Sequence, residues 1–366
     1  MADIFYTLHE HGQSLWYDNI SRDLLQSGEI KALIDAGIRG MTSNPAIFQK
    51  AIVEGKTYDE QLQALVAEGK SVHEIYENLA VSDIQSAADL LRPLYDSSNA
   101  GDGFVSLEVS PLLADQTQAT IDEALRLAEW VDRPNLMIKI PATPEGLPAI
   151  EEALAKGLNI NVTLIFSLEM YKQVIEAFIK GTKRFADAGG DVSKQASVAS
   201  FFVSRVDSLV DSLLDEKGSD VEALKGKAAV ANAKLAYQLY KETFAASDVW
   251  TELEAKGARK QRPLWASTST KNPTYDDLLY VNTLIGPNTV NTAPPQTIDA
   301  FADHGVVEDT VEVGVEESQA VMEQLADAGI DMNAVTDQLL DEGVVKFADA
   351  FKVLMDAIEK KMAAVG

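Results

Sequence analysis

Lys139 lies inside a short apolar run, residues 137–141, and is the residue of this sequence best suited to covalent chemistry. An ammonium that loses its hydration in such surroundings is destabilised, which favours the neutral amine. A neutral amine in an apolar pocket attacks carbonyl carbon and forms a Schiff base. The local sequence fits equally well a lysine at a strand rim that only pairs with a carboxylate.

Two carboxylates, Asp18 and Glu108, stand near the ends of other short apolar runs. Schiff-base formation, dehydration and carbon–carbon cleavage all need proton transfers, and two carboxylates in different surroundings can divide these steps. Taken alone, Asp18 also fits the N-cap of the following helix. Glu108 also fits a structural ion pair.

Uncharged hydrogen-bonding side chains occur at similar places. Asn44 and Asn161 suit the recognition of sugar hydroxyls, and Thr163 suits the holding of a water molecule. The Ser-Asn-Pro sequence around Asn44 is also a good turn sequence, and threonine favours strands in any case. Ser200 is a small hydroxyl within a later apolar run.

Two cations, Arg205 and Lys271, follow the later apolar runs. Phosphate sites in barrels often lie near the loops after the last strands, and arginine binds phosphate through two parallel hydrogen bonds. Ser267 opens a polar stretch that suits either a phosphate site or an ordinary loop. A surface cation is the commoner role for any single Arg or Lys.

The elements that must position these side chains alternate between short apolar runs and longer helical patterns. We predict strands over residues 14–18, 37–42, 104–109, 135–140, 159–163, 196–203, 262–267 and 288–291, and a long helical region over 58–94. Such alternation indicates βαβ units, and eight of them favour a closed (β/α)8 TIM barrel. The glycine-rich turn that an open doubly wound sheet usually carries after its first strand is missing from residues 18–21.

The chain as a whole predicts one (β/α)8-barrel domain over residues 1–366. Residues 318–366 have the pattern of two or three amphipathic helices, which we expect to be a C-terminal helical appendage packed on the barrel. Active sites of such barrels form at the carboxyl ends of the strands. The polar side chains described above should therefore converge on one pocket.

Composition narrows the classes of protein and site. The 57 acidic residues outnumber the 31 basic ones, giving a net charge of −26, which argues against a nucleic-acid partner. The absence of cysteine excludes disulfides and thiolate metal sites, and four scattered histidines argue against a metal centre. Because the sequence shows no signal-peptide pattern and no apolar stretch of ~20 residues, we expect a cytoplasmic protein that makes no membrane contact.

Several segments resemble, in the same order, the motifs of the transaldolase family. They are residues 42–45, 106–111, 137–143, 159–167, 198–207, 264–268 and 280–292, and the similarity extends from about residue 14 to about residue 300. The resemblance implies a (β/α)8 barrel whose fourth strand carries the Schiff-base lysine, Lys139. It also implies that neither a metal nor an organic cofactor is needed.

The resemblance implies further roles for the carboxylates. Asp18 would act as acid and base at the bond that is cleaved. Glu108 would act as acid and base through a water molecule that it holds together with Thr163.

The resemblance also implies a set of substrate-binding residues. Asn44, Asn161 and Ser200 would hold the dihydroxyacetone part of the substrate, and Arg205 would hold its phosphate. Phe202 matches an aromatic position near the pocket.

The chain departs from the family pattern after the seventh strand. Some members carry a second phosphate-binding arginine there, in an Ala-Ser-Phe-Arg context. This chain has Ala-Ser-Thr-Ser-Thr-Lys over residues 266–271, which is similar to a longer bacterial subgroup. Lys271 and Ser267 are the candidates for the missing contact.

The implied activity is that of a transaldolase of the pentose phosphate pathway. Such an enzyme converts sedoheptulose 7-phosphate and glyceraldehyde 3-phosphate to erythrose 4-phosphate and fructose 6-phosphate. We expect sugar phosphates as the small-molecule partners and a monomer or homodimer. Alternatives are a fructose-6-phosphate-type class I aldolase that releases free dihydroxyacetone, a non-catalytic sugar-phosphate-binding barrel, and a metal-dependent barrel enzyme.

Overall fold

The computed structural model describes residues 2–365 and contains a closed barrel of eight parallel strands in chain order. Five residue pairs join the last strand to the first, from Gln13 and Thr289 to Tyr17 and Ala293. This arrangement confirms the predicted (β/α)8 barrel. The strands are β1 (Gln13–Tyr17), β2 (Gly40–Met41), β3 (Phe104–Glu108), β4 (Leu136–Pro141), β5 (Ile160–Ile165), β6 (Ser197–Phe202), β7 (Arg262–Ala266) and β8 (Thr289–Ala293).

The second strand is shorter than the predicted range of residues 37–42. Gly37 has a φ of 115° and ends the preceding helix, and the Ile38 amide still donates to the Leu33 carbonyl oxygen. The left-handed conformation after a helix is the usual place for glycine. Gly37 and Ile38 therefore belong to the end of the helix. The Arg39 amide already donates to the Leu15 carbonyl oxygen at 2.9 Å, and the regular strand is limited to Gly40 and Met41.

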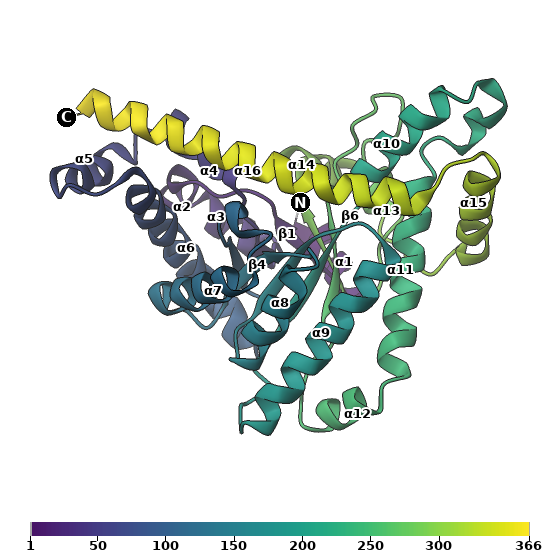
Figure 1. Ribbon diagram of the computed structural model, residues 1–366, viewed down its shortest axis with the longest axis horizontal. Coiled ribbons are helices and arrows are strands. Elements are labelled where there is room, and N and C mark those ends of the chain that lie inside the picture. Colours follow the sequence, from purple (N-terminus) through teal and green to yellow (C-terminus); the bar gives the residue numbers. More distant parts are fainter. Residues whose placement is uncertain (1, 366) are drawn as a thin grey trace.

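Helices surround the barrel, and residues 2–365 include no helix long and apolar enough to cross a lipid bilayer (Figure 1). The shorter early helices are α1 (Ala2–Glu10), α2 (Arg22–Ser27), α3 (Glu29–Asp35), α4 (Pro45–Glu54) and α5 (Asp59–Ala67). The barrel helices that follow are α6 (Val72–Ser97), α7 (Thr117–Val131), α8 (Gly146–Ala155), α9 (Leu168–Asp187), α10 (Ser204–Asp215) and α11 (Ala228–Ala245). The remaining ones are α12 (Asp248–Ala255), α13 (Leu279–Asn282), α14 (Pro295–His304), α15 (Val315–Asp327) and α16 (Met332–Val365).

The predicted helical region over residues 58–94 is two helices, α5 and α6. Gly69 has a φ of 76° between them, and Ser71 begins α6 with a capping box. In that motif the Ser71 hydroxyl accepts from the Glu74 amide, and the Glu74 carboxylate accepts from the Ser71 amide. The predicted region is thus helical but divided in two, because the Ser-x-x-Glu signal at 71–74 marks a new helix start.

The C-terminal segment forms two helices, α15 and α16, of which the second is 34 residues long. Figure 1 shows α16 lying across one end of the barrel, with α12 at the opposite end. A Cβ atom on Gly343 of α16 would lie 2.9 Å from Leu164 Cδ2 at the end of β5, so this helix sits over the carboxyl ends of the strands. The predicted start of the appendage, residue 318, falls inside α15, and Met1 and Gly366 lie outside the described residues.

Candidate active site

Lys139 and Glu108 form a buried ion pair at the carboxyl end of the barrel. The two residues are register partners on β4 and β3, which directs both side chains toward the same space. Lys139 Nζ lies 3.2 Å from Glu108 Oε2 and donates to the Ser43 carbonyl oxygen at 3.3 Å. Both side chains are more than nine-tenths buried. The amine is therefore held in a fixed position and shielded from bulk water.

The surroundings of Glu108 favour its protonated form more than water does. Burial raises the pKa of Glu108, and the positive charge of Lys139 opposes this rise only in part. A carboxyl group with a raised pKa next to an amine can take up a proton and return it. The pair can therefore move a proton without a third group.

Helix α16 covers this pair from outside the barrel. The Phe347 ring centroid lies 5.4 Å from Lys139 Nζ. An aromatic face at this distance stabilises a cation and excludes water from one side of it. This contact could not be predicted from the sequence, because Phe347 is one of many apolar residues along an amphipathic helix.

Asp18 lies directly after β1, and its hydrogen-bond donor comes from the end of β2. Thr42 Oγ1 donates to Asp18 Oδ1 at 2.6 Å. Burial raises the pKa of Asp18, while the Thr42 hydrogen bond and the charges of Lys139 and Lys271 oppose the rise. The alternative role as a helix cap is wrong, because the Ser21 hydroxyl caps α2.

Asn161 and Ser200 belong to one buried chain of hydrogen bonds across three strands. Ser200 Oγ donates to Asn161 Oδ1 at 2.7 Å, and Asn161 Nδ2 donates to Ser106 Oγ at 3.0 Å. These two hydrogen bonds fix the orientation of the Asn161 amide, with Oδ1 toward Ser200 and Nδ2 toward Ser106. The network leaves the lone pairs of the Ser200 hydroxyl available to a ligand.

Thr163 carries a hydroxyl that is buried and has no hydrogen-bond partner among the described residues. The register between β5 and β6 shifts between Val162 and Ile165, and Leu164 in this bulge has a φ of 60°. Bulges beside active sites commonly re-aim a side chain. An orphaned hydroxyl at this place suits a bound water molecule.

The oxygen and the nitrogen of the Asn44 side-chain amide have different surroundings. Its Oδ1 accepts from the Ile47 amide at 3.0 Å and caps α4. The oxygen thus has a structural role, as the cap of a helix and not as part of a turn. The Nδ2 group has no hydrogen-bond partner among residues 2–365, which leaves it available to donate.

Arg205 lies in the first turn of α10, half-buried and outside any ion pair within the described chain. Its guanidinium carbon lies 5.1 Å from the centroid of the Phe202 ring, and its Nη1 is buried without a hydrogen-bond partner. Burial lowers the pKa of Arg205, and Glu342 on α16 opposes the change. A desolvated guanidinium with a free nitrogen is suited to bind an anion.

The loop after β7 brings Ser267 and Lys271 to the same end of the barrel in different ways. Ser267 has a φ of 57°, and its hydroxyl is 2.9 Å from that of Ser204 at the start of α10. It therefore fixes the loop against the helix that carries Arg205. Lys271 is exposed, and its charge acts on Asp18.

Three residues near this site were not predicted from the sequence. Thr42 belongs to the same short motif as Asn44, so its position was visible although its hydrogen bond to Asp18 was not. Phe347 and Glu342 come from α16, and only the packing of that helix places them beside Lys139 and Arg205.

A separate recess exists at the other end of the barrel. A recess of about 830 Å³ lies at the amino ends of the strands, away from the ion pair of Lys139. The chemistry is assigned to the carboxyl end because the buried amine and both carboxylates lie there. Within residues 2–365, no three His, Asp or Glu side chains are grouped as a metal site requires.

Comparisons with known proteins show the family of this chain. The family model for transaldolase/fructose-6-phosphate aldolase matches residues 15–358. A transaldolase of Trichodesmium erythraeum is 51% identical over 363 residues, which cover 96% of this chain and 95% of the relative. Transaldolases of Acidothermus cellulolyticus and Mycobacterium bovis are each 50% identical, covering 99% and 94% of this chain and 98% and 93% of their own. The chain belongs to the transaldolase/fructose-6-phosphate aldolase family and is an enzyme of the transaldolase kind, a transferase.

Proposed function

We propose that Lys139 forms the Schiff base of a transaldolase reaction and carries a three-carbon dihydroxyacetone unit from a ketose phosphate to an aldose phosphate. The observation that carries this proposal is the buried pair of Lys139 Nζ and Glu108 Oε2, 3.2 Å apart. The pair combines a nucleophile with a group able to take its proton.

The reaction begins with the transfer of a proton from the Lys139 ammonium to Glu108, whose raised pKa favours this step. The neutral amine then attacks the C2 carbonyl of the ketose and forms a carbinolamine. Glu108 returns the proton to the C2 hydroxyl through a water molecule held by Thr163. Water leaves, and an iminium ion remains on Lys139.

Cleavage follows at the C3–C4 bond. Asp18 takes the proton of the C4 hydroxyl, the C3–C4 bond breaks, and its electron pair moves into the iminium to give an enamine. Sedoheptulose 7-phosphate releases erythrose 4-phosphate in this step. The enamine attacks the aldehyde carbon of glyceraldehyde 3-phosphate, and Asp18 returns its proton to the new hydroxyl. Hydrolysis of the resulting iminium releases fructose 6-phosphate and frees Lys139.

The remaining predicted site residues bind the substrate. The hydroxyl groups of the dihydroxyacetone unit are uncharged, and they form hydrogen bonds with Asn44 Nδ2, Asn161 and Ser200. Arg205 takes the phosphate through its unpartnered Nη1, above the Phe202 ring. Binding the phosphate far from the bond that breaks orients the reacting carbons.

A second contact to the phosphate comes from the loop after β7. Lys271 is exposed there and free to turn toward the anion. Ser267 positions the loop through its contact with Ser204. Together they stand where other family members place a second arginine.

We place the reaction in the cytoplasm, because its substrates are charged sugar phosphates of central metabolism. We also propose that the protein works as a monomer or homodimer without a nucleic-acid partner. The net charge of −26 supports the second point, since it repels polyphosphate chains.

Trapping the intermediate tests the proposal directly. The protein is incubated with fructose 6-phosphate, reduced with borohydride, digested and analysed by mass spectrometry. We expect a three-carbon adduct on Lys139 alone, with the other lysines of the digest as internal controls. Lys139→Met protein should give no adduct and no turnover. Folded wild-type protein that forms no adduct on Lys139 would contradict the assignment.

A further inference from the structure

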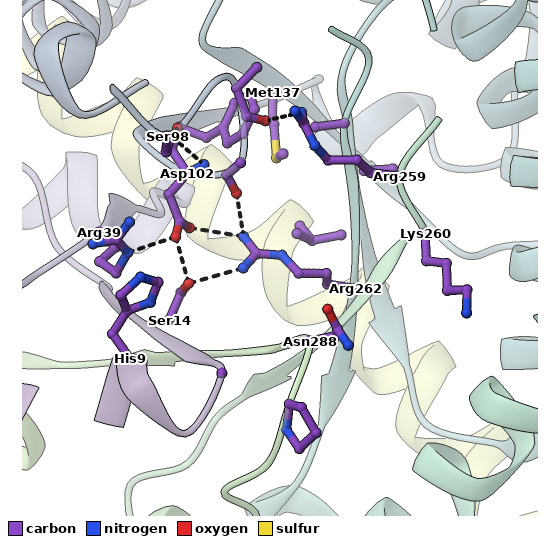
Figure 2. A pocket seen from close by; sticks show the side chains of 18 of the residues that line it. His9, Ser14, Arg39, Ser98, Asp102, Met137, Arg259, Lys260, Arg262 and Asn288 are labelled. Carbon is purple, nitrogen blue, oxygen red and sulfur yellow. Dashed lines mark hydrogen bonds and ion pairs between the residues drawn. The ribbon is translucent and has the colours of Figure 1, made fainter. Parts of the chain in front are cut away.

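A recess lies at the end of the barrel opposite to Lys139. It has a volume of about 830 Å³ and is shown in Figure 2. The residues that line it include the first residues of several strands and the segment after α12, among them Ser14, Phe104, Ser197, Lys260 and Arg262. The volume falls within the range of small-molecule sites in proteins, about 300–1,000 Å³.

The charge of this recess is opposite to that of the whole protein. Four cations line it, Arg39, Arg259, Lys260 and Arg262, against only two carboxylates, Asp102 and Glu254. Acidic residues outnumber basic ones by 57 to 31 in the chain. The lining therefore keeps two positive charges that no lining carboxylate neutralises, in a hollow where the field is concentrated.

One buried carboxylate serves two of these guanidinium groups. Asp102 accepts from Arg39 Nε at 2.7 Å and from Arg262 Nη2 at 2.9 Å. Figure 2 shows Asp102 between the two arginines, with Ser14 beside them. Neither terminal nitrogen of Arg39 has a hydrogen-bond partner within the described part of the chain. These nitrogens remain available as donors at the recess.

Lys260 is also incompletely neutralised. Its Nζ lies 3.9 Å from the nearest oxygen of Glu254, which is longer than a hydrogen bond. Arg259 is different, because its guanidinium donates to backbone carbonyl oxygens, including that of Ala100 at 2.9 Å. The available cations are thus Arg39 and Lys260, on two sides of the hollow.

Tyr240 supplies an independent sign of a missing ligand. Its side chain lines the recess and is 3% exposed, and its hydroxyl is buried without a hydrogen-bond partner among residues 2–365. Burial raises the pKa of Tyr240 to about 12, while the charge of Arg262 opposes the rise. The hydroxyl is therefore a donor at neutral pH, and an unpaired buried donor is costly.

We propose that this recess is a second binding site, which takes a small molecule carrying a phosphate or diphosphate group with at least two negative charges. The free donors of Arg39, Lys260 and Tyr240 bind the anion, and a planar guanidinium group can donate two parallel hydrogen bonds to two oxygens of a phosphate. Leu94 and Pro287, which line the recess and are not buried, offer apolar surface to the rest of the ligand. The proposal does not depend on the transaldolase chemistry, because the site shares no residue with it.

Titration calorimetry with inorganic pyrophosphate at low ionic strength tests the proposal. Arg205→Ala protein is used as the parent, since it lacks the phosphate contact proposed for the active site. In this parent, Lys260→Ala is compared with Lys256→Ala as a matched control, because Lys256 is exposed and lies outside the lining. Tyr240→Phe has Tyr171→Phe as its control, because the Tyr171 hydroxyl is equally buried and unpartnered but lies outside the lining.

We expect one pyrophosphate per chain in the parent. Lys260→Ala should weaken binding by about tenfold, as the loss of a charge-assisted contact does, and Tyr240→Phe by about fivefold. Both controls should stay within about twofold of the parent. No binding to the parent would overturn the proposal. Equal losses in Lys256→Ala and Lys260→Ala would also overturn it, since they would indicate a general surface attraction.

Discussion

Asp18 and Glu108 are both carboxyl groups whose pKa is raised by burial, and the charge of Lys139 opposes the rise in both, but the group that opposes it most is different. Glu108 has an ammonium 3.2 Å away, whereas Asp18 has the Thr42 hydroxyl at 2.6 Å. A hydroxyl that donates to a carboxylate stabilises only its ionised form. Thr42 thus adjusts the carboxyl group assigned to the cleavage step and leaves the Lys139 pair unchanged.

The residue-scale prediction concerns Thr42→Val. Loss of the hydrogen bond removes a contribution that lowers the pKa of Asp18, so this pKa rises further. Asp18 must be ionised to take the C4 proton, and kcat/KM should therefore begin to fall at a higher pH as the solution is acidified. A charge-assisted hydrogen bond corresponds to about one pH unit. The measurement is kcat/KM from pH 4 to pH 8.

Thr292→Val is the matched control, because Thr292 lies 2.6 Å from the Thr42 hydroxyl and has no hydrogen bond to Asp18. Its acid limb should stay close to that of the wild type. An acid limb that does not move in Thr42→Val would exclude Asp18 as the titrating base.

At the scale of elements, α16 completes a site whose other parts come from the barrel. It brings Phe347 to 5.4 Å from Lys139 Nζ and Glu342 near Arg205. Gly343 permits the close approach, since any side chain there would meet Leu164. Exclusion of water from an active site protects reactive intermediates from hydrolysis. The enamine that we propose on Lys139 would be such an intermediate once the first aldose has left.

Phe347→Ala should therefore make the enzyme more like an aldolase. Water should reach the enamine, and the release of free dihydroxyacetone from fructose 6-phosphate without an acceptor should rise severalfold relative to transfer. Val345→Ala is the control, because Val345 is exposed on the same helix. The ratio of release to transfer is measured with a coupled assay for dihydroxyacetone. An unchanged ratio in Phe347→Ala would show that α16 does not protect the intermediate.

The elements show how far the sequence alone determines this fold and site. Eight apolar runs predicted the barrel, because parallel strands covered by helices are apolar on both faces. Lys139 was identifiable because a cation inside such a run is unusual. Phe347 was not, since the sequence of an amphipathic helix indicates which face is apolar but not which surface it covers. The β2 range was wrong because apolar residues at 37–42 serve a helix end as well as a strand.

Over the whole molecule, the two ends of the barrel differ in how charged side chains are stabilised. At the carboxyl end, the phosphate-binding role that we propose for Arg205 requires it to attract an anion in a protein of net charge −26, and its partial burial reduces the screening of that attraction. At the amino end, Asp102 lies among cations. Burial alone would raise its pKa, but the charges of Arg262 and Arg39 outweigh burial and hold the pKa below its ordinary value.

Asp102→Asn should destabilise the whole barrel. Removal of one partner from a buried ion pair typically costs about 3–5 kcal/mol, because the opposite charges remain. The pKa of Asp102 is lowered in the folded state, so its contribution is present above the unfolded value of about 3.9 and is lost as the pH falls below it. Urea unfolding of wild type and variant should differ at pH 7 and converge as the pH falls below about 4.

Asp96→Asn is the control for this change, because Asp96 forms an exposed ion pair with Arg92. Such pairs contribute about 0–1 kcal/mol, so the control should unfold close to the wild type. If the two variants unfolded at the same urea concentration, the cluster around Asp102 would not stabilise the barrel.

The order of the elements along the chain has a consequence for synthesis on the ribosome. The barrel closes with β8, which ends at Ala293, whereas Phe347 follows 54 residues later. At the usual rate of elongation this interval is roughly 3–10 s. During that time a nascent chain already carries Lys139, Asp18 and Glu108 but not their cover. With Lys139 as the proposed nucleophile, its amine would then be open to carbonyl compounds in the cell, and prompt docking of α16 would also protect the enzyme from them.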